Sequence, residues 1–249
     1  MSTSAIYEAV IGAVARRVSA KPKHLDVGAG RGQLIALLRE RLQADSRACD
    51  FHVENFRLHD VPIARTNLDK EPLPFADAEF DVVTCSEVVE HVENPRRLMR
   101  EAWRVLKPGG TLVMTTPNVL NAVSRVRYLV SGFANLFGPL PAKNDKLYST
   151  GGHITPLPYF YLAHALLDAD FGEVELDIDR TQKTSVLLAV LFFPLIALGW
   201  LRFWGREERK YGTLTPENRV HVARHFSWRM LVGRTVVVSA RKLHAPKAP

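Results

Sequence analysis

The sequence predicts an α/β fold in which helices cover both faces of a mostly parallel sheet. Two observations carry this prediction: short apolar segments alternate with amphipathic helical segments, and a glycine-rich loop, Gly28-Ala-Gly-Arg-Gly32, follows the first apolar segment. Right-handed crossovers between parallel strands then give a doubly wound layout. The 249 residues, 47% hydrophobic and 24% charged, suffice for a single domain over residues 1–249 with a full core.

The first half of the chain alternates strands with helices. Ile6, Val10 and Val14 recur at helical spacing within residues 4–19, and Pro22 ends that helix. Residues 54–79 are rich in proline, aspartate and asparagine, so we expect mostly loop there. The other expected elements are a strand at 24–27, a helix at 33–41, a strand at 46–53, a strand at 80–86 and a helix at 95–106 that Pro95 opens.

The second half contains two long connections. Residues 119–157 are interrupted by glycine and proline, and because loops of that length usually have a function, we expect a substrate lid. Residues 180–233 form an apolar insertion between the last two strands. The remaining expected elements are a turn at 107–110, a strand at 111–116, a helix at 158–169 and strands at 172–178 and 234–240.

Charge and cysteine content restrict the partners and the compartment. The net charge of +7 suits nucleic acid, anionic lipid or an anionic substrate. The basic residues of 96–107 spread over several faces of their helix without interleaved aromatic residues, so we expect no nucleic-acid partner. Cys49 and Cys85 lie in or beside apolar runs, and Met1-Ser-Thr-Ser-Ala has no secretory pattern, so we expect a reduced, cytoplasmic protein.

Two acidic residues frame the glycine-rich loop. The loop alone also fits dinucleotide-binding enzymes or a purely structural turn. Asp50 lies about twenty residues beyond Gly30, at the end of the second expected strand, where such sheets hold a ribose diol. Asp26 directly precedes the loop, where its carboxylate would repel a pyrophosphate but attract an amino group and a sulfonium. The combination favours S-adenosylmethionine over a dinucleotide.

Three ordered motifs resemble the class I S-adenosylmethionine-dependent methyltransferases, in particular those of the ubiquinone pathway. The motifs are Leu25-Asp-Val-Gly-Ala-Gly-Arg-Gly32, the segment Leu73–Val92, and Arg104-Val-Leu-Lys-Pro-Gly-Gly-Thr-Leu-Val-Met-Thr-Thr-Pro-Asn118. The resemblance covers residues 20–120 and continues more weakly beyond them. It implies a Rossmann-like, doubly wound, mostly parallel seven-stranded sheet with a C-terminal antiparallel strand, to which this chain adds an apolar helical insertion.

The resemblance also assigns residues to S-adenosylmethionine. It implies that the glycine loop lines the methionine part, that Asp50 holds the ribose, and that Asn67-Leu68-Asp69 reaches the adenine. Related sequences often read Asp-Leu-Asn at that triplet, so either Asn67 or Asp69 faces the adenine. Ser86 and Glu87 would lie beside the methyl donor. The expected cofactor-binding residues are Asp26, Gly28, Gly30, Gly32, Asp50, Asn67, Leu68, Asp69 and Ser86.

Glu87-Val-Val-Glu90-His91 is the candidate for the chemistry of transfer. Residues 87, 90 and 91 fall within one helical turn, so Glu87 can share a face with Glu90 or His91. The pattern resembles a metal site of ubiquinone-pathway O-methyltransferases and of small-RNA 2′-O-methyltransferases, with His153 as a further ligand for a divalent metal ion. Alternatively, Glu87, His91 or His153 is catalytic without a metal, or Glu90 only pairs with an arginine of the next helix.

The insertion contains an uncharged apolar run at 186–201, with basic residues on both sides and tryptophans at its end that suit a membrane interface. The run cannot simply cross a bilayer, because the strands before and after it belong to one sheet. It re-enters, lies in the interface, or packs on protein as a lid or dimer helix. We expect contact with the inner face of the cell membrane and a lipid-linked substrate.

Together the motifs predict an S-adenosylmethionine-dependent methyltransferase that modifies an oxygen atom of a small or lipid-linked acceptor. Two alternatives remain: methylation of RNA, which the basic charge suits, and a non-catalytic methyltransferase fold that binds a membrane or a partner. The intact cofactor motifs argue against the non-catalytic alternative. Neither the identity of the acceptor nor the oligomeric state is predicted.

Overall fold

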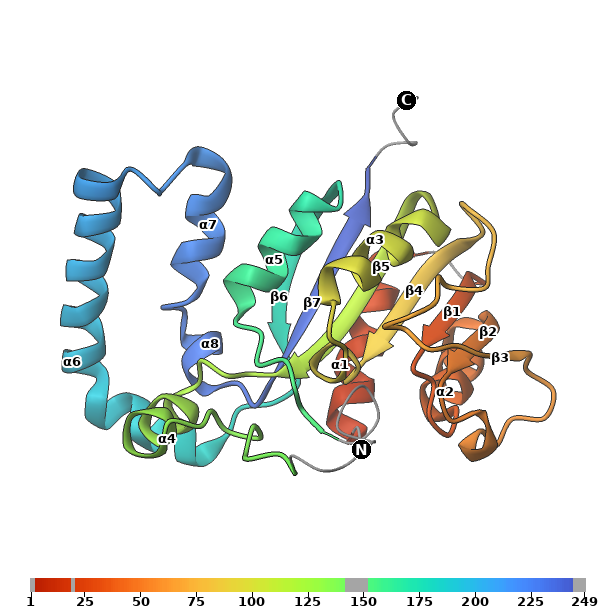
Figure 1. Ribbon diagram of the computed structural model, residues 1–249, viewed down its shortest axis with the longest axis horizontal. Coiled ribbons are helices and arrows are strands. Elements are labelled where there is room, and N and C mark those ends of the chain that lie inside the picture. Colours follow the sequence, from red (N-terminus) through yellow and green to blue (C-terminus); the bar gives the residue numbers. More distant parts are fainter. Residues whose placement is uncertain (1–2, 19–20, 142–151, 244–249) are drawn as a thin grey trace.

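A seven-stranded sheet in the order β3-β2-β1-β4-β5-β7-β6 forms the centre of the computed structural model, which describes residues 3–18, 21–141 and 152–243 (Figure 1). β1 to β5 are parallel, and β7 runs antiparallel between β5 and β6. The predicted sheet and its antiparallel C-terminal strand are therefore confirmed. The strands are β1 (Lys23–Val27), β2 (Asp45–Asp50), β3 (Ile63–Arg65), β4 (Phe80–Ser86), β5 (Leu106–Pro117), β6 (Phe171–Ile178) and β7 (Thr235–Lys242).

The register brings the carboxyl ends of the parallel strands to one edge of the sheet. In the middle, Val27 of β1 is level with Cys49 of β2 on one side and with Cys85 of β4 on the other. The order of the strands reverses between β1 and β4. Open α/β sheets bind ligands at the carboxyl edge beside such a reversal, so the topology itself points to the loops after β1, β2 and β4.

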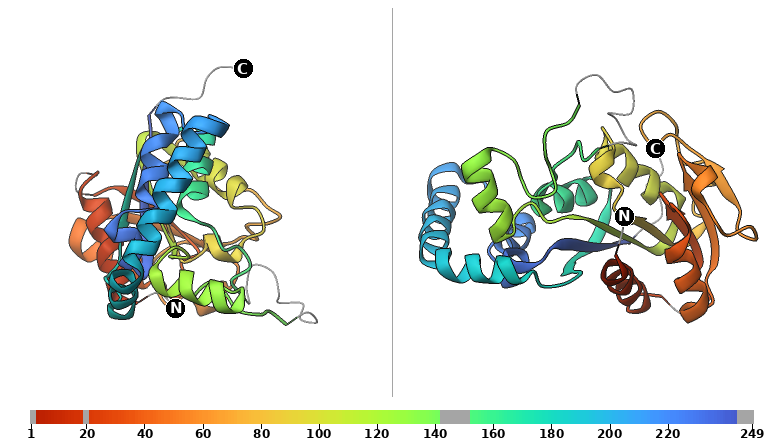
Figure 2. Two further views of the ribbon diagram at one scale, coloured as in Figure 1. Left: turned by 90° about the vertical axis from the view of Figure 1, so that its left-hand side faces the viewer. Right: turned by 90° about the horizontal axis from the view of Figure 1, so that it is seen from below.

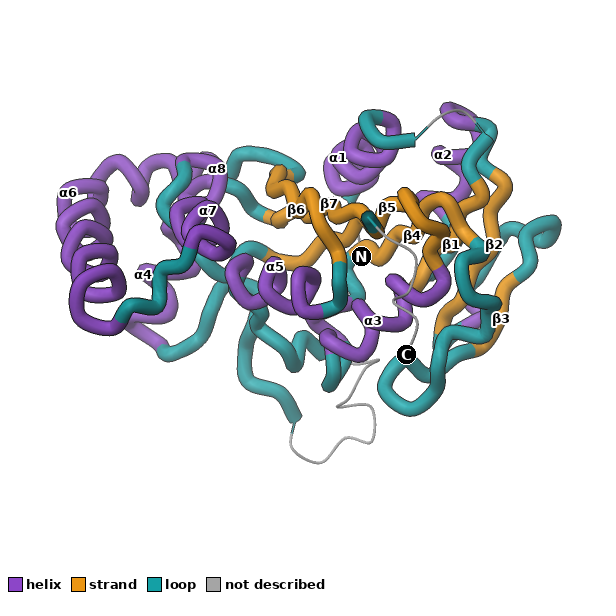
Figure 3. The backbone as a smooth tube through the Cα atoms, turned by 90° about the horizontal axis from the view of Figure 1, so that it is seen from above, coloured by secondary structure: helices purple, strands orange, loops and turns teal. Residues whose placement is uncertain are grey.

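Helices cover both faces of the sheet. α1 and α2 lie on one face, whereas α3 and α5 lie on the other (Figure 3). Val82 and Val83 of β4 point to opposite faces, and each is fully buried in the apolar core on its own side. These helices are α1 (Ser4–Ala15), α2 (Gln33–Leu42), α3 (Pro95–Val105) and α5 (Tyr159–Asp168).

The remaining helices form a lateral layer beyond β6, which Figures 1 and 2 show on one side of the molecule. A small apolar core holds this layer together where α4, α6 and α8 meet, and it contains Ala122, Ala189 and Leu231. α6 bends along its length, and Pro194 inside it removes one backbone hydrogen bond. The elements are α4 (Ala122–Ser131), α6 (Lys183–Arg206), the π-helical turn η3 (Glu207–Tyr211), α7 (Pro216–Arg224) and α8 (Trp228–Val232).

The structure corrects the expected turn at 107–110 and adds detail to two other regions. The region 54–79 contains β3, a short edge strand, and residues 106–117 form one strand because a shift in register lets Leu106 pair with Phe80 before the turn residues. The proposed lid at 119–157 contains α4, and residues 142–151 lie outside the described part of the chain. Two 3₁₀ turns, η1 (Val53–Asn55) and η2 (Val89–His91), follow β2 and β4.

Candidate cofactor and acceptor cleft

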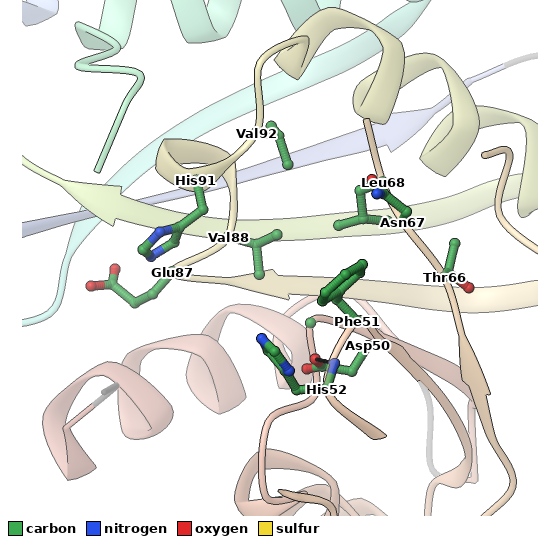
Figure 4. A pocket seen from close by; sticks show the side chains of 11 residues that line it. Asp50, Phe51, His52, Thr66, Asn67, Leu68, Glu87, Val88, His91 and Val92 are labelled. Carbon is green, nitrogen blue, oxygen red and sulfur yellow. Dashed lines mark hydrogen bonds between the residues drawn. The ribbon is translucent and has the colours of Figure 1, made fainter. Parts of the chain in front are cut away.

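A cleft opens at the carboxyl edge of the sheet, between the loops that follow β1, β2 and β4. Two adjoining cavities form it, and both are lined by Gly28, Glu87 and His91. Figure 4 shows the first cavity, with Asp50 and His52 on one wall, Asn67 and Leu68 on another, and His91 at one end. The second cavity continues along the glycine loop to Asp26 and His153.

The glycine loop presents its backbone to the cleft. Gly30 has φ +54°, and no atom lies within 4 Å of the place where a Cβ would stand, so a ligand can approach this peptide closely. Gly28 has φ +73°, and a Cβ there would lie 2.3 Å from Cγ2 of Val88. The loop therefore needs glycine for two different reasons: open space at residue 30 and close packing on the loop after β4 at residue 28.

Asp50 is fixed by backbone donors at the end of β2. Its Oδ2 accepts a hydrogen bond from the Gly30 amide at 2.8 Å, and its Oδ1 accepts one from the His52 amide at 2.7 Å. The carboxylate thus links the loops after β1 and β2 and faces the first cavity. Each oxygen keeps a lone pair that can accept a hydroxyl of a ribose diol.

Asp26 lies deeper, at the floor of the second cavity, and is 3% exposed. The Thr84 hydroxyl donates to its Oδ1 at 2.6 Å, and His24 Nε2 lies 2.8 Å from the same hydroxyl. Because the threonine proton points to Asp26, His24 donates through Nε2 and accepts from Ser46 through Nδ1, at 3.0 Å. Burial raises the pKa of Asp26 to about 7, an effect that Thr84 opposes and the charge of Asp50 reinforces.

The triplet that was expected to reach the adenine is divided. Asn67 and Leu68 line the first cavity together with Phe51. Asp69 is not among the lining residues, and its Oδ1 instead accepts a hydrogen bond from the Glu93 amide at 2.8 Å. Of the two candidate residues, Asn67 therefore lines the cavity and Asp69 does not. Phe51, a flat apolar wall, lacked a distinctive sequence pattern.

Glu87 stands apart from the other members of the Glu-x-x-Glu-His motif. It adopts φ +58°, and its Oε1 accepts a hydrogen bond from the Thr115 hydroxyl at 3.0 Å. Residues 89–91 then form a 3₁₀ turn rather than a continuing α-helix. The expectation that Glu87 shares a helical face with Glu90 or His91 is therefore wrong. Glu87 still lines both cavities, and Ser86 lines the second one.

Glu90, His91 and His153 come together at the end of the cleft. One possible ligand atom from each lies within 4.8 Å of those of the other two. The rings of His91 and His153 meet edge to face, with 4.8 Å between their centroids. Glu90 is fully buried, and neither of its carboxylate oxygens has a hydrogen-bond partner. Burial, with the charge of Glu87 adding to it, raises the pKa of Glu90 to about 8.

Arg96 and Arg97 do not pair with Glu90, so that alternative is wrong. Arg96 forms a salt bridge with Asp168 at 3.1 Å, and Arg97 donates to the backbone carbonyl of Asp69 at 2.8 Å. An unpartnered buried carboxylate is costly unless it is protonated or binds a cation. The structure thus fits two chemical states of Glu90: a neutral acid, or a ligand to a divalent cation beside two imidazoles.

His91 is held in a defined tautomer. Its Nδ1 lies 2.8 Å from the Gly152 carbonyl, which can only accept, so the proton is on Nδ1 and Nε2 keeps a free lone pair. Burial lowers the pKa of His91, which favours the neutral ring. The backbone carbonyl of Glu90 accepts hydrogen bonds from Ile154 and Thr155, and these bonds fasten the returning segment beside His91.

Comparison with known proteins gives partial matches in sequence and full-length matches in fold. A family described as "Methyltransferase domain" matches residues 25–114. A ubiquinone biosynthesis O-methyltransferase of Psychrobacter arcticus is 35% identical over 106 residues, which are 39% of this chain and 41% of that protein. One of Coxiella burnetii is 28% identical over 51% of this chain and 57% of that protein. The chain thus spans about half the length of the curated relatives it matches.

Solved structures extend the likeness of the fold over the whole chain. A SAM-dependent methyltransferase from Archaeoglobus fulgidus has a TM-score of 0.58 at 17% identity, covering 95% of this chain and 94% of that one. Phosphoethanolamine N-methyltransferase 2 of Haemonchus contortus, in complex with S-adenosyl-L-methionine, has a TM-score of 0.51 at 13% identity, covering 95% of this chain and 53% of that one. At such identities the likeness concerns the fold.

Proposed function

We propose that this chain, which matches a methyltransferase domain over residues 25–114, is a class I S-adenosylmethionine-dependent methyltransferase and transfers the methyl group of S-adenosylmethionine to an oxygen atom of a small or lipid-linked acceptor. The donor site is supported by the hydrogen bond from the Gly30 amide to Asp50, in a loop with free space beside Gly30 and at the point where the strand order reverses. Asp50 would hold the ribose, Asn67 would meet the adenine, and Asp26 would face the amino group. When bound, S-adenosylmethionine supplies a methyl group on a sulfonium.

His91 is the proposed general base for the acceptor hydroxyl. Its Nδ1–H is held by the Gly152 carbonyl, so the lone pair of Nε2 is free to take a proton. His153 lies edge-on to the His91 ring and limits its rotation, while both side chains line the second cavity beside the glycine loop. Such positioning of the two reactants supplies much of the rate enhancement in group transfer.

The same residues also fit a second arrangement, in which they bind a divalent cation. Glu90, His91 and His153 would hold it, and the unpartnered carboxylate of Glu90 is the observation in its favour. Bound there, the cation would supply Lewis-acid stabilisation of the acceptor oxygen. Chelation therefore separates the two arrangements, because a base acting without metal remains active in a chelator.

An apolar groove in the lateral layer supports an acceptor that carries an apolar chain. The groove has a volume of about 640 Å³ and lies between α5, α6 and α7. Phe160, Ile196 and Trp200 contribute to its walls. Arg125 and Glu207 also line the groove, so both signs of charge are present, and the Arg125 guanidinium donates to two backbone carbonyls. The apolar chain of a lipid-linked acceptor matches this lining.

Calorimetric titration with S-adenosylhomocysteine tests the donor site. We expect binding by the full chain and loss of at least about tenfold in affinity for Asp50→Ala, because a ribose diol would lose its carboxylate partner. Asp60→Ala is the matched control, since its carboxylate pairs with Arg39 at the surface, neither residue lines the cleft, and its loss should leave the affinity unchanged. Absence of binding by the wild-type chain would overturn the proposal.

Transfer of labelled methyl groups from S-adenosylmethionine into lipid and aqueous extracts tests the acceptor and the base. We expect label in an ether linkage of the product, and we expect His91→Asn to lose about a hundredfold or more in rate while binding S-adenosylhomocysteine normally. The same assay after chelation, with and without added Mg²⁺ or Mn²⁺, decides between the base and the metal arrangement. Label on nitrogen or carbon would contradict the oxygen assignment.

A further inference from the structure

The outer face of α6 is an exposed apolar stripe. Six leucine and valine side chains are more than half exposed, and their positions repeat at intervals of three and four residues, so they fall on one side of the helix. No other described segment covers them. The opposite side of α6 packs on the body of the protein through Ser185 and Ala189, which are fully buried. The exposed side chains are Leu187, Val190, Leu191, Leu195, Leu198 and Leu201.

The tip of α4 extends the same apolar surface. Tyr128, Leu129 and Val130 end this helix and are 63%, 82% and 76% exposed. More than fifty positions separate α4 from α6 in the sequence, yet the two helices lie side by side (Figures 1 and 2) and share a small buried core. Two neighbouring helices therefore expose apolar side chains, and neither group lines the cleft.

The charges of α6 lie near its two ends and are basic, and acidic residues follow only in η3, where Glu208 pairs with Arg219. Between Lys183 and Arg202 the helix carries no charged residue, and α6 as a whole contains no acidic residue. Lys183 lies at the start of the stripe, and Arg202 and Arg206 lie at its C-terminal end, whereas Trp200 and Trp204 face inward onto Phe226 and Arg219. Apolar side chains with basic residues at both ends match the boundary between acyl chains and anionic headgroups in a bilayer.

The length of the helix allows a transmembrane span, but the topology excludes one. The continuous helical stretch Lys183–Tyr211 has 29 residues and a mean hydropathy of 2.2 in its most apolar window. The chain leaves the sheet after Ile178 and returns at Val236, and these two residues are paired in neighbouring strands. A single crossing would place β6 and β7 on opposite sides of the membrane. The helix must lie along a surface instead.

We propose that the outer stripe of α6 and the tip of α4 form a docking surface that seats this protein on one leaflet of an anionic bilayer without spanning it. The proposal rests on exposure, topology and charge, and it is independent of methyl transfer. The earlier alternative of a buried lid helix is wrong for the single chain, because the stripe faces outward. A second copy of the chain is the competing occupant, and the test below distinguishes it.

Flotation of the full chain with phospholipid vesicles tests the docking surface. We expect the wild type to float with vesicles of phosphatidylcholine containing about one third phosphatidylglycerol, and to float less with pure phosphatidylcholine or in high salt. The combined variant Leu129→Gln, Leu191→Gln, Leu198→Gln should reduce vesicle binding at least about tenfold, because three apolar side chains leave the interface. Binding of S-adenosylhomocysteine by the variant shows that it is folded.

The matched control carries glutamine at exposed apolar positions elsewhere. Leu167 on α5 is 38% exposed and Val220 on α7 is 50% exposed, and neither belongs to the docking surface. Leu167→Gln with Val220→Gln should float like the wild type. The proposal would be overturned if this control lost vesicle binding to the same extent as the triple variant. It would also be overturned if the folded wild type stayed in the soluble fraction. A wild-type dimer in light scattering that the triple variant converts to a monomer would assign the surface to a second copy.

Discussion

Asp26 and Asp50 end neighbouring strands of one sheet but are held in different environments. Two backbone amides donate to Asp50 at the mouth of the cleft. Asp26 is buried and accepts a hydrogen bond from the Thr84 hydroxyl, which in turn accepts one from His24. Burial lowers the pKa of His24 to about 3. The group behind Asp26 is thus neutral at physiological pH and supplies no charge to stabilise the carboxylate. A cationic ligand would supply that charge.

The affinity for the donor should therefore depend on the ionisation of Asp26. Folding raises the pKa of Asp26 from 3.8 to about 7, so ionising this carboxyl costs free energy in the folded protein. This cost is absent below the pKa of the unfolded chain and is fully present above about pH 7. A bound ammonium group offsets this penalty. We predict that calorimetry will show affinity for S-adenosylhomocysteine rising severalfold between about pH 6 and about pH 8, with proton release on binding near pH 6.5.

Two variants separate this effect from a general dependence on pH. Asp26→Asn should bind more weakly and with a flat profile over the same range, because its amide does not titrate. Thr84→Val removes the hydroxyl that lowers the pKa of Asp26, so the rise should move to higher pH. A profile for Asp26→Asn with the slope of the wild type would contradict the assignment.

At the scale of elements, α4 is fastened at its start by one buried asparagine. Asn121 Oδ1 accepts from the Ser124 amide at 2.8 Å, which caps the helix, and its Nδ2 donates to the Gly233 carbonyl at 3.1 Å. Asn118 donates to the same carbonyl at 2.9 Å. These bonds tie α4 to the chain that enters β7, so the orientation of α4 depends on groups more than a hundred residues away.

Replacing that cap should loosen the lateral layer. We predict that Asn121→Ala lowers the free energy of unfolding by about 2 kcal/mol, the sum of a lost cap and a buried carbonyl left with one donor fewer. Denaturation by urea measures the change. Ser131→Ala is the control in the same helix, because its hydroxyl donates to Arg127 at an exposed position. A loss for Ser131→Ala as large as that for Asn121→Ala would show that the cap is unimportant.

Elements with a strong pattern were predictable, and elements that depend on partners were not. Apolar periodicity and glycine or proline boundaries predicted β1, β4 and α3 at nearly their observed bounds. α4 contains three valines, which form helices poorly alone, and its packing on α6 cannot be read from local sequence. β3 has three residues at an edge, too few for any alternation.

The site shows the same division. Spacing placed Asp26 and Asp50 at the cleft, because strand ends of a parallel sheet meet at one edge, and the resemblance to methyltransferases added Asn67. The separation of Glu87 from Glu90 depends on the left-handed conformation of residue 87, for which glutamate gives no signal. His24 likewise carried no motif, since its role follows from the register that sets it beside Thr84 and Ser46.

On the scale of the whole molecule, the lateral layer except α4 is an insertion between the antiparallel strands β6 and β7. Its two ends stay together: the Gln182 amide donates to the Val232 carbonyl at 2.8 Å, and Thr181 bridges to Gly233. No residue of 183–226 lines the cleft. α7 packs on α5, where His221 Nδ1 lies 3.0 Å from the Tyr159 hydroxyl. The cofactor cleft and the docking surface are therefore separate parts of one fold.

This separation predicts the outcome of removing the layer. A chain in which a short glycine-serine linker replaces residues 183–226 should fold and bind S-adenosylhomocysteine within about threefold of the wild type, because distant sites are nearly additive. It should lose vesicle binding and melt several degrees lower, since α5 loses its contacts with α7. Calorimetry, flotation and thermal denaturation check these points. Loss of ligand binding in a folded deletion chain would show that the two parts are coupled.

The direction of β6 has a consequence for kinetics. β6 and β5 are both antiparallel to β7, so β6 ends at the edge where the cleft opens, and α6 starts there. A protein seated through α6 would hold its cleft close to the lipid and search for its acceptor in two dimensions. The rate of methyl transfer should then depend on the surface concentration of the acceptor in the bilayer rather than on its bulk concentration. Adding inert phospholipid to the assay would slow the reaction at constant bulk acceptor, as dilution within a surface requires.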